Sequence, residues 1–207
     1  MSRRPLVIVF ARVPQLGRVK TRLARDIGTM GAWRFYRSTL AATLRRLRRD
    51  RRWELCVAAT PDTLARGGWT PRDGVAVRRQ GRGDLGVRML RAIRGAGRRP
   101  VAVVGCDIPD LDATAVSRAL RLLASHDAVF GPSRDGGYWL IGWRGAPPPP
   151  RLLDGVRWST SAARADSAAR LGSRRVGYAD ILDDVDEGAD LVRLGRARAT
   201  PSPSVGR

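Results

Sequence analysis

The sequence predicts one α/β domain, built as a three-layer sandwich around a mostly parallel central sheet. Two observations predict this class. Short, continuous apolar runs alternate with stretches of helical periodicity, and the runs lack the alternation typical of a half-exposed strand. The 207 residues suffice for one domain with a substantial core. We expect this domain to span residues 1–198, followed by a mobile tail over 199–207 that contains prolines and serines.

Apolar runs mark the strands in chain order, and apolar residues three or four apart mark the helices between them. Strands are predicted at 6–11, 55–59, 75–77, 101–104, 127–131 and 138–143. Helices are predicted around 33–47, 85–93, 116–123, 159–171 and 187–197, and the proline run 147–150 predicts a loop. Ligands bind beyond the carboxyl ends of the strands in such sheets. This rule selects the loops after Ala11, Gln80, Gly105 and Pro132.

The charge balance is strongly basic. A formal net charge of +20 is the usual footprint of a nucleic-acid-binding protein. However, Lys20 is the only lysine and the arginines are scattered through every segment, which we interpret as the codon bias of a GC-rich genome. The arginines of 45–52 alternate with Leu44 and Leu47 as on a solvated helix face. An arginine-rich nucleic-acid-binding protein remains an alternative, but we expect no specific nucleic-acid partner.

The remaining composition excludes several classes of protein. Hydrophobic residues make up 43% of the chain, which excludes wholesale disorder. No apolar run approaches the roughly 20 residues of a membrane span. Cys56 and Cys106 lie in apolar runs and His126 is the single histidine, which argues against a disulfide framework, a zinc site and a histidine triad. We expect a cytoplasmic location.

The loop after the first predicted strand, residues 12–23, could bind an anion. It contains one glycine, Gly17, and three cations, Arg18, Lys20 and Arg22, next to the start of a helix. The N–H groups and dipole at a helix start favour negative charge. Neither a dinucleotide-binding G-x-G-x-x-G motif nor a complete P-loop is present. A solvated turn with incidental arginines explains the same residues equally well.

Two carboxylates follow the predicted strand at 101–104. Asp107 comes soon after the apolar run and Asp110 lies three residues further on, with no cation between them. This arrangement suits a hard divalent cation such as Mg²⁺. Alternatively, Asp110 or Asp112 caps the helix that begins near Ala113.

Three further segments carry polar residues that also have a structural explanation. The two glycines after Asp135 allow a ligand to approach the backbone, or form a tight turn. The acidic run 183–187 could instead complement the dipole of the last helix. Asp84, in the Gly-Asp-Leu-Gly segment 83–86, could be no more than a helix cap.

Six motifs in this order resemble one family of small bacterial transferases, known as DUF2064. Its members are also called radical-SAM/selenodomain-associated transferases or arsenosugar-biosynthesis glycosyltransferases. The motifs are 17–23, 83–86 with 88–89, 106–111, 131–132 with 135–138, 158–160, and 184–186 with 190–191.

The resemblance covers residues 5–195 and implies the GT-A-like, Rossmann-like fold of nucleotide-diphospho-sugar transferases. The family is also similar to the guanylyltransferases of phospholactate and molybdopterin cofactor synthesis. Two departures bear on the fit of a nucleotide. Arg12 stands where lysine is expected, and Gln15-Leu16 replaces a proline-rich turn.

The resemblance implies a role for each motif. It assigns a Mg²⁺ or Mn²⁺ ion to Asp107 and Asp186. Catalysis falls to Lys20, Asp107 and Asp135, with Asp135 as the base that activates the acceptor. The residues implied at the nucleotide and its phosphates are Arg18, Lys20, Arg22, Gly83 and Asp84. Those implied around the acceptor are Gly136, Gly137, Tyr138 and Trp158.

The function that the resemblance implies is metal-dependent transfer from a nucleotide-activated donor to a small-molecule acceptor. We expect glycosyl transfer from a nucleotide-sugar, which the family name favours, with a nucleoside diphosphate leaving. The cation-rich first loop suits the alternative, nucleotidyl transfer from a nucleoside triphosphate with pyrophosphate leaving. The metal site serves either reaction.

Overall fold

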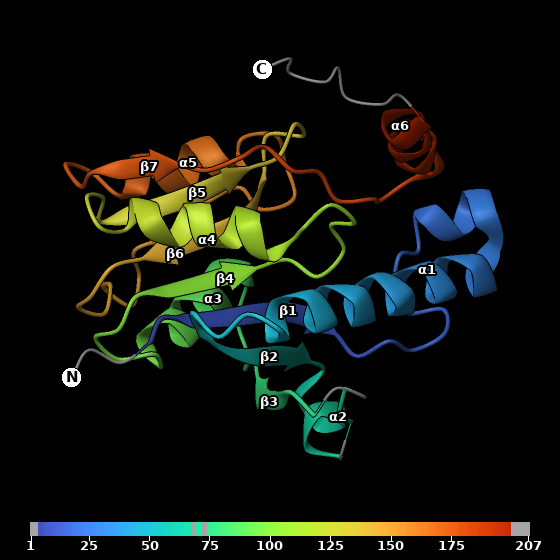
Figure 1. The fold of residues 1–207 in the computed structure, drawn as a ribbon, viewed down its shortest axis with the longest axis horizontal. Coiled ribbons are helices and arrows are strands. Elements are labelled where there is room, and N and C mark those ends of the chain that lie inside the picture. Colours follow the sequence, from blue (N-terminus) through green and yellow to red (C-terminus); the bar gives the residue numbers. More distant parts are fainter. Residues whose placement is uncertain (1–3, 68, 72–73, 200–207) are drawn as a thin grey trace, which may run out of the picture.

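The computed structural model describes residues 4–67, 69–71 and 74–199. Its strands form one seven-stranded sheet in the order β3-β2-β1-β4-β6-β5-β7, with helices on both faces (Figure 1). The strands are β1 Leu6–Arg12, β2 Glu54–Thr60, β3 Ala76–Arg79, β4 Val101–Val104, β5 Ala128–Pro132, β6 Tyr138–Trp143 and β7 Val176–Tyr178. The helices are α1 Leu23–Arg48, α2 Asp62–Arg66, α3 Leu85–Arg94, α4 Ala113–Leu122, α5 Ala163–Arg170 and α6 Gly188–Ala199. The predicted three-layer α/β domain is confirmed.

The sheet is parallel except around β6. β1 pairs in parallel with both β2 and β4, β2 with β3, and β5 with β7, whereas β6 pairs antiparallel with β4 and β5. The β1–β4 register runs from Leu6 opposite Val101 to Val9 opposite Val104. The loops after these two strands therefore start side by side at the carboxyl edge of the sheet.

Alternate residues of each strand face two separate cores, as the two-residue period of a strand requires. Along β1, Val7 and Val9 belong to the core that includes α1 and α4, whereas Leu6 and Ile8 belong to the core that includes α3. Because both faces of β1 are buried, its sequence is a continuous apolar run rather than an alternating one.

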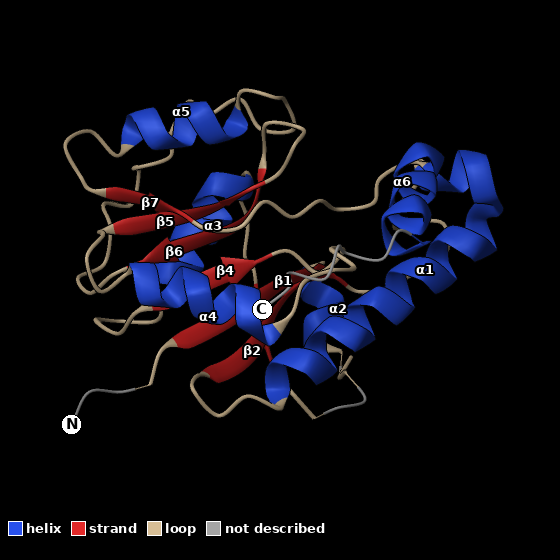
Figure 2. Cartoon of the chain, turned by 45° about the horizontal axis from the view of Figure 1, so that its top comes forward, coloured by secondary structure: helices blue, strands red, loops and turns tan. Residues whose placement is uncertain are grey.

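The longest helix is interrupted near its start. α1 begins at Leu23 rather than near Trp33, and Gly28, with φ 74° and ψ 157°, breaks it so that the first turns are offset from the rest (Figure 1). α6 lies beside these first turns (Figure 2). A small third core, which includes Leu23, Ala32 and Val185, joins the two helices. This packing holds the segment before α6 next to the loop after β1.

The remaining differences from the predicted elements fall on short or irregular segments. α2 and β7 have five and three residues, too few for a periodic pattern. The helix predicted over 159–171 begins only at Ala163, since Ser159 has a left-handed φ of 60°. The tail predicted at 199–207 lies outside the described residues except for Ala199. No helix among the described residues is long and apolar enough to cross a membrane.

A buried tyrosine ties together three segments that border the carboxyl edge of the sheet. The hydroxyl of Tyr36, on α1, accepts a hydrogen bond from the backbone N–H of Arg12 at 2.8 Å and donates one to the carbonyl of Arg12 at 2.9 Å. It also lies 3.2 Å from Sγ of Cys106, in the loop after β4. Burial raises the pKa of both the Tyr36 hydroxyl and the Cys106 thiol. The tyrosine therefore links α1 to the ends of β1 and β4 as a neutral group.

Replacing Tyr36 with phenylalanine is expected to lower the free energy of unfolding by about 1–3 kcal/mol, because two backbone groups lose their partner at a buried site. Urea denaturation followed by circular dichroism measures the change. Tyr178→Phe is the matched control, since Tyr178 is 50% exposed and should change stability by less than about 0.5 kcal/mol. Equal losses for the two variants would contradict a structural role for the Tyr36 hydroxyl.

Candidate active site

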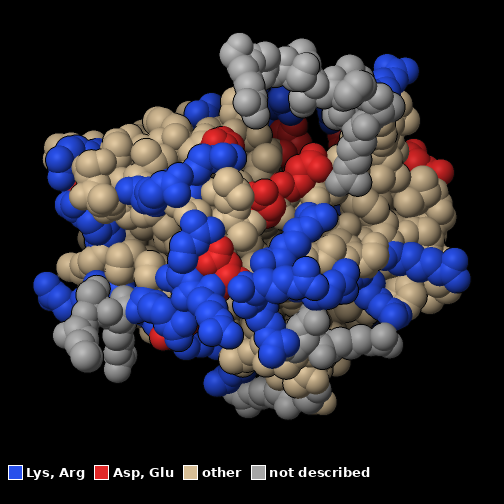
Figure 3. All heavy atoms as spheres, in the orientation of Figure 1, with Lys and Arg blue, Asp and Glu red and all other residues tan. Residues whose placement is uncertain are grey.

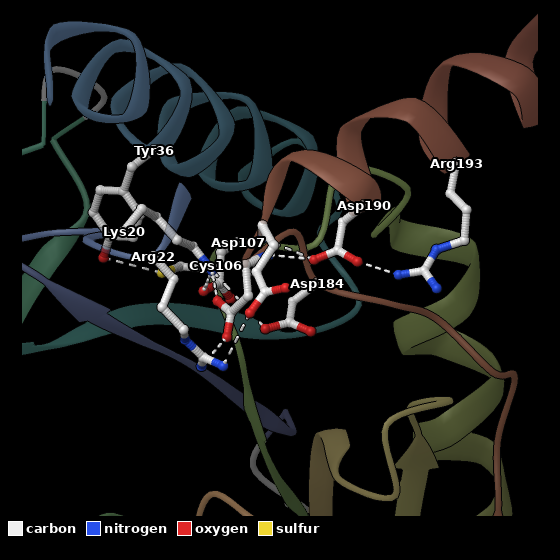
Figure 4. Close-up of polar contacts among 10 residues, drawn as sticks. Lys20, Arg22, Tyr36, Cys106, Asp107, Asp184, Asp190 and Arg193 are labelled. Carbon is white, nitrogen blue, oxygen red and sulfur yellow. Dashed lines mark hydrogen bonds and ion pairs between the residues drawn. The ribbon is translucent and has the colours of Figure 1, made fainter. Parts of the chain in front are cut away.

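Four charged side chains meet at the carboxyl edge of the sheet, and Figure 4 labels Lys20, Asp107 and Asp184 among them. Lys20 comes from the loop after β1, Asp107 from the loop after β4, and Asp184 and Asp186 from the segment between β7 and α6. Nζ of Lys20 lies 2.6 Å from Oδ2 of Asp107 and 2.5 Å from Oδ1 of Asp186. It lies 3.9 Å from Oδ2 of Asp184. The Lys20 side chain is only 6% exposed, so water screens these ion pairs poorly.

Burial and mutual charge set the pKa values of this cluster. Burial would lower the pKa of Lys20, but the charges of Asp107 and Asp186 outweigh it and raise the pKa. Burial would raise the pKa of Asp186, but Lys20 and then Arg22 outweigh it and lower the pKa. Burial, followed by the negative charge of Asp107, raises the pKa of Asp184 to about 7. The cluster therefore holds more negative charge than Lys20 alone neutralises.

The carboxylates form a donor set for a cation. One oxygen from each of Asp107, Asp184 and Asp186 lies within 4.8 Å of the other two, and we call these three residues the carboxylate cluster. Hard divalent cations such as Mg²⁺ and Mn²⁺ prefer anionic oxygen ligands. The raised pKa of Asp184 indicates that added positive charge would be favourable there. The residues present therefore fit Mg²⁺ or Mn²⁺.

Hydrogen bonds from neighbouring helices hold the acidic segment in place. Oδ2 of Asp190, on α6, accepts from the backbone N–H groups of Asp186 at 2.8 Å and Glu187 at 2.9 Å. Oδ2 of Asp26, on α1, accepts from the N–H of Gly188 at 2.7 Å. Sequence reasoning missed Asp26, since nothing distinguishes it from any acidic residue in the first turns of a helix.

A cleft at this edge has two lobes that meet at the carboxylate cluster. The first, which we call the cationic lobe, has a volume of about 530 Å³. Five cationic residues line it: Arg12, Arg18, Lys20, Arg22 and Arg88. Arg22 pairs with Asp186 at 2.5 Å. Within the described part of the chain, Arg12, Arg18 and Arg88 form no ion pair with a carboxylate. The lobe is therefore suited to an anionic ligand.

Gln80 holds the side chain of Arg88 in place at the edge of the cationic lobe. The Gln80 side chain is buried at the end of β3, and its Nε2 donates to the carbonyls of Ala11 and Ala58 at 3.2 and 2.8 Å. Its Oε1 accepts from Nη1 of Arg88 at 2.7 Å. Burial and then the nearby charge of Arg12 lower the pKa of Arg88, because both disfavour its positive form. The sequence marked the loop after Gln80 but gave neither Gln80 nor Arg88 a role, although the family motif at 88–89 includes Arg88.

The second lobe, which we call the aromatic lobe, has a volume of about 460 Å³. Tyr138 and Trp158 line it with ring centroids 6.4 Å apart, edge to face. Asp135 and Gly137 also line it, and Oδ1 of Asp135 accepts from the N–H of Gly137 at 2.8 Å. Oδ2 of Asp135 has no hydrogen-bond partner among the described residues. This lobe offers apolar faces and one carboxylate to a ligand.

The Gly-Asp-Leu-Gly segment acts through packing and capping. Oδ1 of Asp84 accepts from the N–H of Val87 and caps α3. A side chain at Gly86 would place its Cβ 2.6 Å from the ring of Trp158, so glycine lets that ring pack on α3. Neither Gly83 nor Asp84 lines either lobe, whereas Leu85 lines both.

The structure thus brings most of the predicted site residues to one cleft. The residues that line a lobe are Arg18, Lys20, Arg22, Asp107, Asp135, Gly137, Tyr138, Trp158 and Asp186. Gly83, Asp84 and Gly136 line neither lobe. Asp184 completes the carboxylate cluster, although sequence reasoning assigned it no ligand role. Asp184 lies in the same acidic run as Asp186, and this position was the sequence signal that could have identified it as a ligand.

The basic surface extends well beyond this cleft. Figure 3 shows Lys and Arg side chains over much of the visible face, with fewer Asp and Glu side chains among them. On the described residues, many arginines pair locally with a carboxylate, as in Arg52 with Asp50 and Arg157 with Asp166. The unpaired cations of the cationic lobe differ from these because they face a cavity.

The turn at Gly136 has no room for a side chain. Gly136 has φ 85°, and a Cβ there would lie 2.0 Å from the backbone oxygen of Ser161. Gly136→Ala is expected to cost about 2 kcal/mol or more in the free energy of unfolding, because a backbone clash is added to left-handed strain. Gly145→Ala is the matched control, with φ 74° and nothing within 4 Å. This control should lose only about 1 kcal/mol in the free energy of unfolding, as measured by urea denaturation. Equal losses of stability in the two variants would contradict a backbone clash at Gly136.

Comparisons with known proteins identify the family of the chain. The family DUF2064, described as "Uncharacterized protein conserved in bacteria", matches residues 43–160. A crystal structure from Desulfovibrio desulfuricans G20, provisionally named a nucleotide-diphospho-sugar transferase, is 31% identical with a TM-score of 0.85. The match covers 98% of this chain and 90% of that chain. No curated protein matches the sequence.

More distant structures share the fold. CMP:2-keto-3-deoxy-manno-octonic acid synthetase, complexed with CTP, is 12% identical with a TM-score of 0.58, covering 95% of this chain and 98% of that chain. Rv0371c from Mycobacterium tuberculosis H37Rv, complexed with manganese, is 16% identical with a TM-score of 0.52, covering 94% and 98%. The GT-A-like fold predicted from the sequence is confirmed. The chain belongs to the DUF2064 family, within the nucleotide-diphospho-sugar transferase superfamily.

Proposed function

We propose that the protein is a divalent-metal-dependent transferase that moves a group from a nucleotide-activated donor to a small-molecule acceptor. The observation that carries this proposal is the position of the carboxylate cluster and Lys20 where the cationic and aromatic lobes meet. The donor phosphates would bind in the cationic lobe and the acceptor in the aromatic lobe. Bond breakage would then occur beside the cluster.

Asp107, Asp184 and Asp186 would hold a Mg²⁺ or Mn²⁺ ion. When bound, such an ion neutralises charge on phosphate oxygens. The manganese complex of Rv0371c supports this assignment by analogy of fold. Arg18, Arg22 and Arg88 would donate hydrogen bonds to the donor phosphates, and charge-assisted bonds of this kind are strong.

Asp135 is the proposed base for the acceptor. It lines the aromatic lobe, and its Oδ2 has no partner among the described residues while Oδ1 is held by Gly137. A carboxylate beside an acceptor hydroxyl can take its proton as the new bond forms. Tyr138 and Trp158 would supply apolar faces against the acceptor.

Charge balance favours nucleotidyl transfer from a nucleoside triphosphate. The five cations of the cationic lobe and the three carboxylates leave two net positive charges, and a divalent ion raises this to four. A nucleoside triphosphate carries about four negative charges at neutral pH, whereas a nucleotide-sugar carries about two. The CTP complex of the synthetase of the same fold is consistent with this donor. Pyrophosphate would leave, and the nucleotidyl group would pass to the acceptor.

Glycosyl transfer from a nucleotide-sugar is the second candidate. It is favoured by the name of the relative from D. desulfuricans, which is 31% identical. The two aromatic rings of the second lobe also present faces on which a sugar ring can pack. In this reaction a nucleoside diphosphate would leave.

The two donors can be compared directly by binding. With each nucleobase in turn, the thermal stability of the protein is measured with the triphosphate or the matching nucleotide-sugar, with and without Mg²⁺ or Mn²⁺. The preferred donor should raise the melting temperature more, since a ligand stabilises the folded state by mass action. We expect a triphosphate to give the larger, metal-dependent shift. A larger shift with the nucleotide-sugar would favour glycosyl transfer, and none with any nucleotide would contradict both.

Asp107→Asn should keep the fold, measured by circular dichroism, but weaken metal-dependent nucleotide binding by about 100-fold. The physical reason is the loss of an anionic ligand from the carboxylate cluster. Asp110→Asn is the matched control, because Asp110 is in the same loop and lines neither lobe. The nucleotide affinities of the parent and both variants are measured by calorimetric titration across a range of Mg²⁺ concentrations. If Asp107→Asn binds nucleotide as tightly as the parent, the assignment of the metal site is wrong.

A further inference from the structure

We propose that Lys20 is an internal counter-cation: it occupies the carboxylate cluster until metal and donor bind together, and they then displace it toward the donor phosphates. This inference rests on the metal site of the proposed function. It adds a coupling between two ligands, in which each is bound more tightly when the other is present.

The contacts of the ammonium group carry the first step. Nζ of Lys20 lies 2.6 Å from Asp107 and 2.5 Å from Asp186, which are two of the three candidate metal ligands, and 3.9 Å from the third, Asp184. A divalent ion bound to these oxygens would face the positive charge of Nζ at close range. The low exposure of the side chain, 6%, leaves little water to screen that repulsion. Metal and ammonium therefore compete for the same carboxylates.

The side chain has an alternative position. Lys20 lines the cationic lobe as well as the cluster, and Arg18 and Arg22 flank it along the chain. A lysine side chain is long and flexible, so its ammonium can move while the backbone stays in place. Phosphates of a donor in this lobe would supply a new anionic partner. Metal alone must displace Lys20 without compensation, whereas metal with donor restores an ion pair to it.

The chemistry of the residue agrees with this role. Every other basic residue of the chain except His126 is an arginine. An ammonium is a compact point charge with three donors, which suits a site among three carboxylates, whereas a guanidinium is planar and wide. Lysine at this position therefore meets a requirement that arginine does not.

Metal binding to the protein without nucleotide tests the proposal. The concentration of free Mn²⁺ is followed by electron paramagnetic resonance for the parent and Lys20→Met. Methionine is unbranched, as lysine is, so it should tolerate the φ of 49° equally well. Lys20→Met should bind Mn²⁺ about tenfold more tightly than the parent, because a competing charge is gone. Nucleoside triphosphate should tighten Mn²⁺ binding to the parent and do so much less for the variant.

Arg22→Met is the matched control. Arg22 also pairs with Asp186, but its side chain is 59% exposed, so its removal should strengthen Mn²⁺ binding much less. Equal or weaker Mn²⁺ binding by Lys20→Met than by the parent would overturn the role of Lys20. Asp107→Asn is measured beside it, because the loss of a ligand from the carboxylate cluster should weaken Mn²⁺ binding. Absence of Mn²⁺ binding in every variant, with or without nucleotide, would instead overturn the metal site of the proposed function.

A second measurement needs no substitution. Because Lys20 is the only lysine, protein labelled with ¹³C and ¹⁵N in lysine gives one set of side-chain signals by nuclear magnetic resonance, all from Lys20. Saturating Mg²⁺ alone should move the Nζ and Cε signals away from their ion-paired positions, and triphosphate added with Mg²⁺ should move them to a third position. Signals that stay in place at saturating Mg²⁺, as judged by calorimetry, would show that Lys20 keeps its carboxylate partners and would overturn the proposal.

Discussion

The parallel pairing of β1 with β4 decides where chemistry can occur in this molecule. Two strands that run side by side in the same direction must release their chains at the same edge, and the register from Leu6–Val101 to Val9–Val104 fixes that edge. Lys20 and Asp107 meet because each belongs to the loop that follows one of these strands. The apolar residues of β1 and β4 thus have a functional consequence, since their pairing brings the ammonium of Lys20 and the carboxylate of Asp107 to the same edge.

Around that edge, opposite charges are brought together at close range and partly out of water. A buried ion pair gains little net stability, because the loss of hydration offsets much of the attraction. The cluster is moreover unbalanced, with three carboxylates around one lysine. Such an arrangement does not serve the stability of the fold. It is maintained by the surrounding structure, in which Tyr36, Asp190 and Asp26 hold the three contributing segments in position.

The sequence was most informative where local pattern and tertiary position coincide. The run 101–104 is a strand with the predicted bounds, and Asp107 beyond it lies at the site as the strand-end rule predicts. Asp84 illustrates the opposite case, because a helix cap and a ligand-binding carboxylate have the same local signature, and its hydrogen bond to Val87 identifies the cap. Gln80 and Asp26 were not predictable, since their roles depend on which segments pack beside them. Arg88 belongs to one of the six family motifs, but the resemblance implied no role for it. The requirement for glycine at 86 likewise depends on Trp158, a distant residue in the sequence.

The ion pair between Lys20 and Asp186 joins residues 166 positions apart in the sequence, and its second partner arrives on a segment that lies outside the sheet. That segment is held by its own hydrogen bonds, such as that from the N–H of Val185 to the carbonyl of Asp107 at 3.3 Å, and by α6. The described contacts of α6 include a small core with the first turns of α1. Elements with few buried contacts open locally at lower free energy than strands in a continuous core. Detachment of α6 would therefore free Asp186 and Glu187 from their hydrogen bonds to Asp190 while the central strands stay paired. Order in the acidic segment and integrity of the sheet are thus partly separable properties in this fold, and α6 contributes to the first more than to the second.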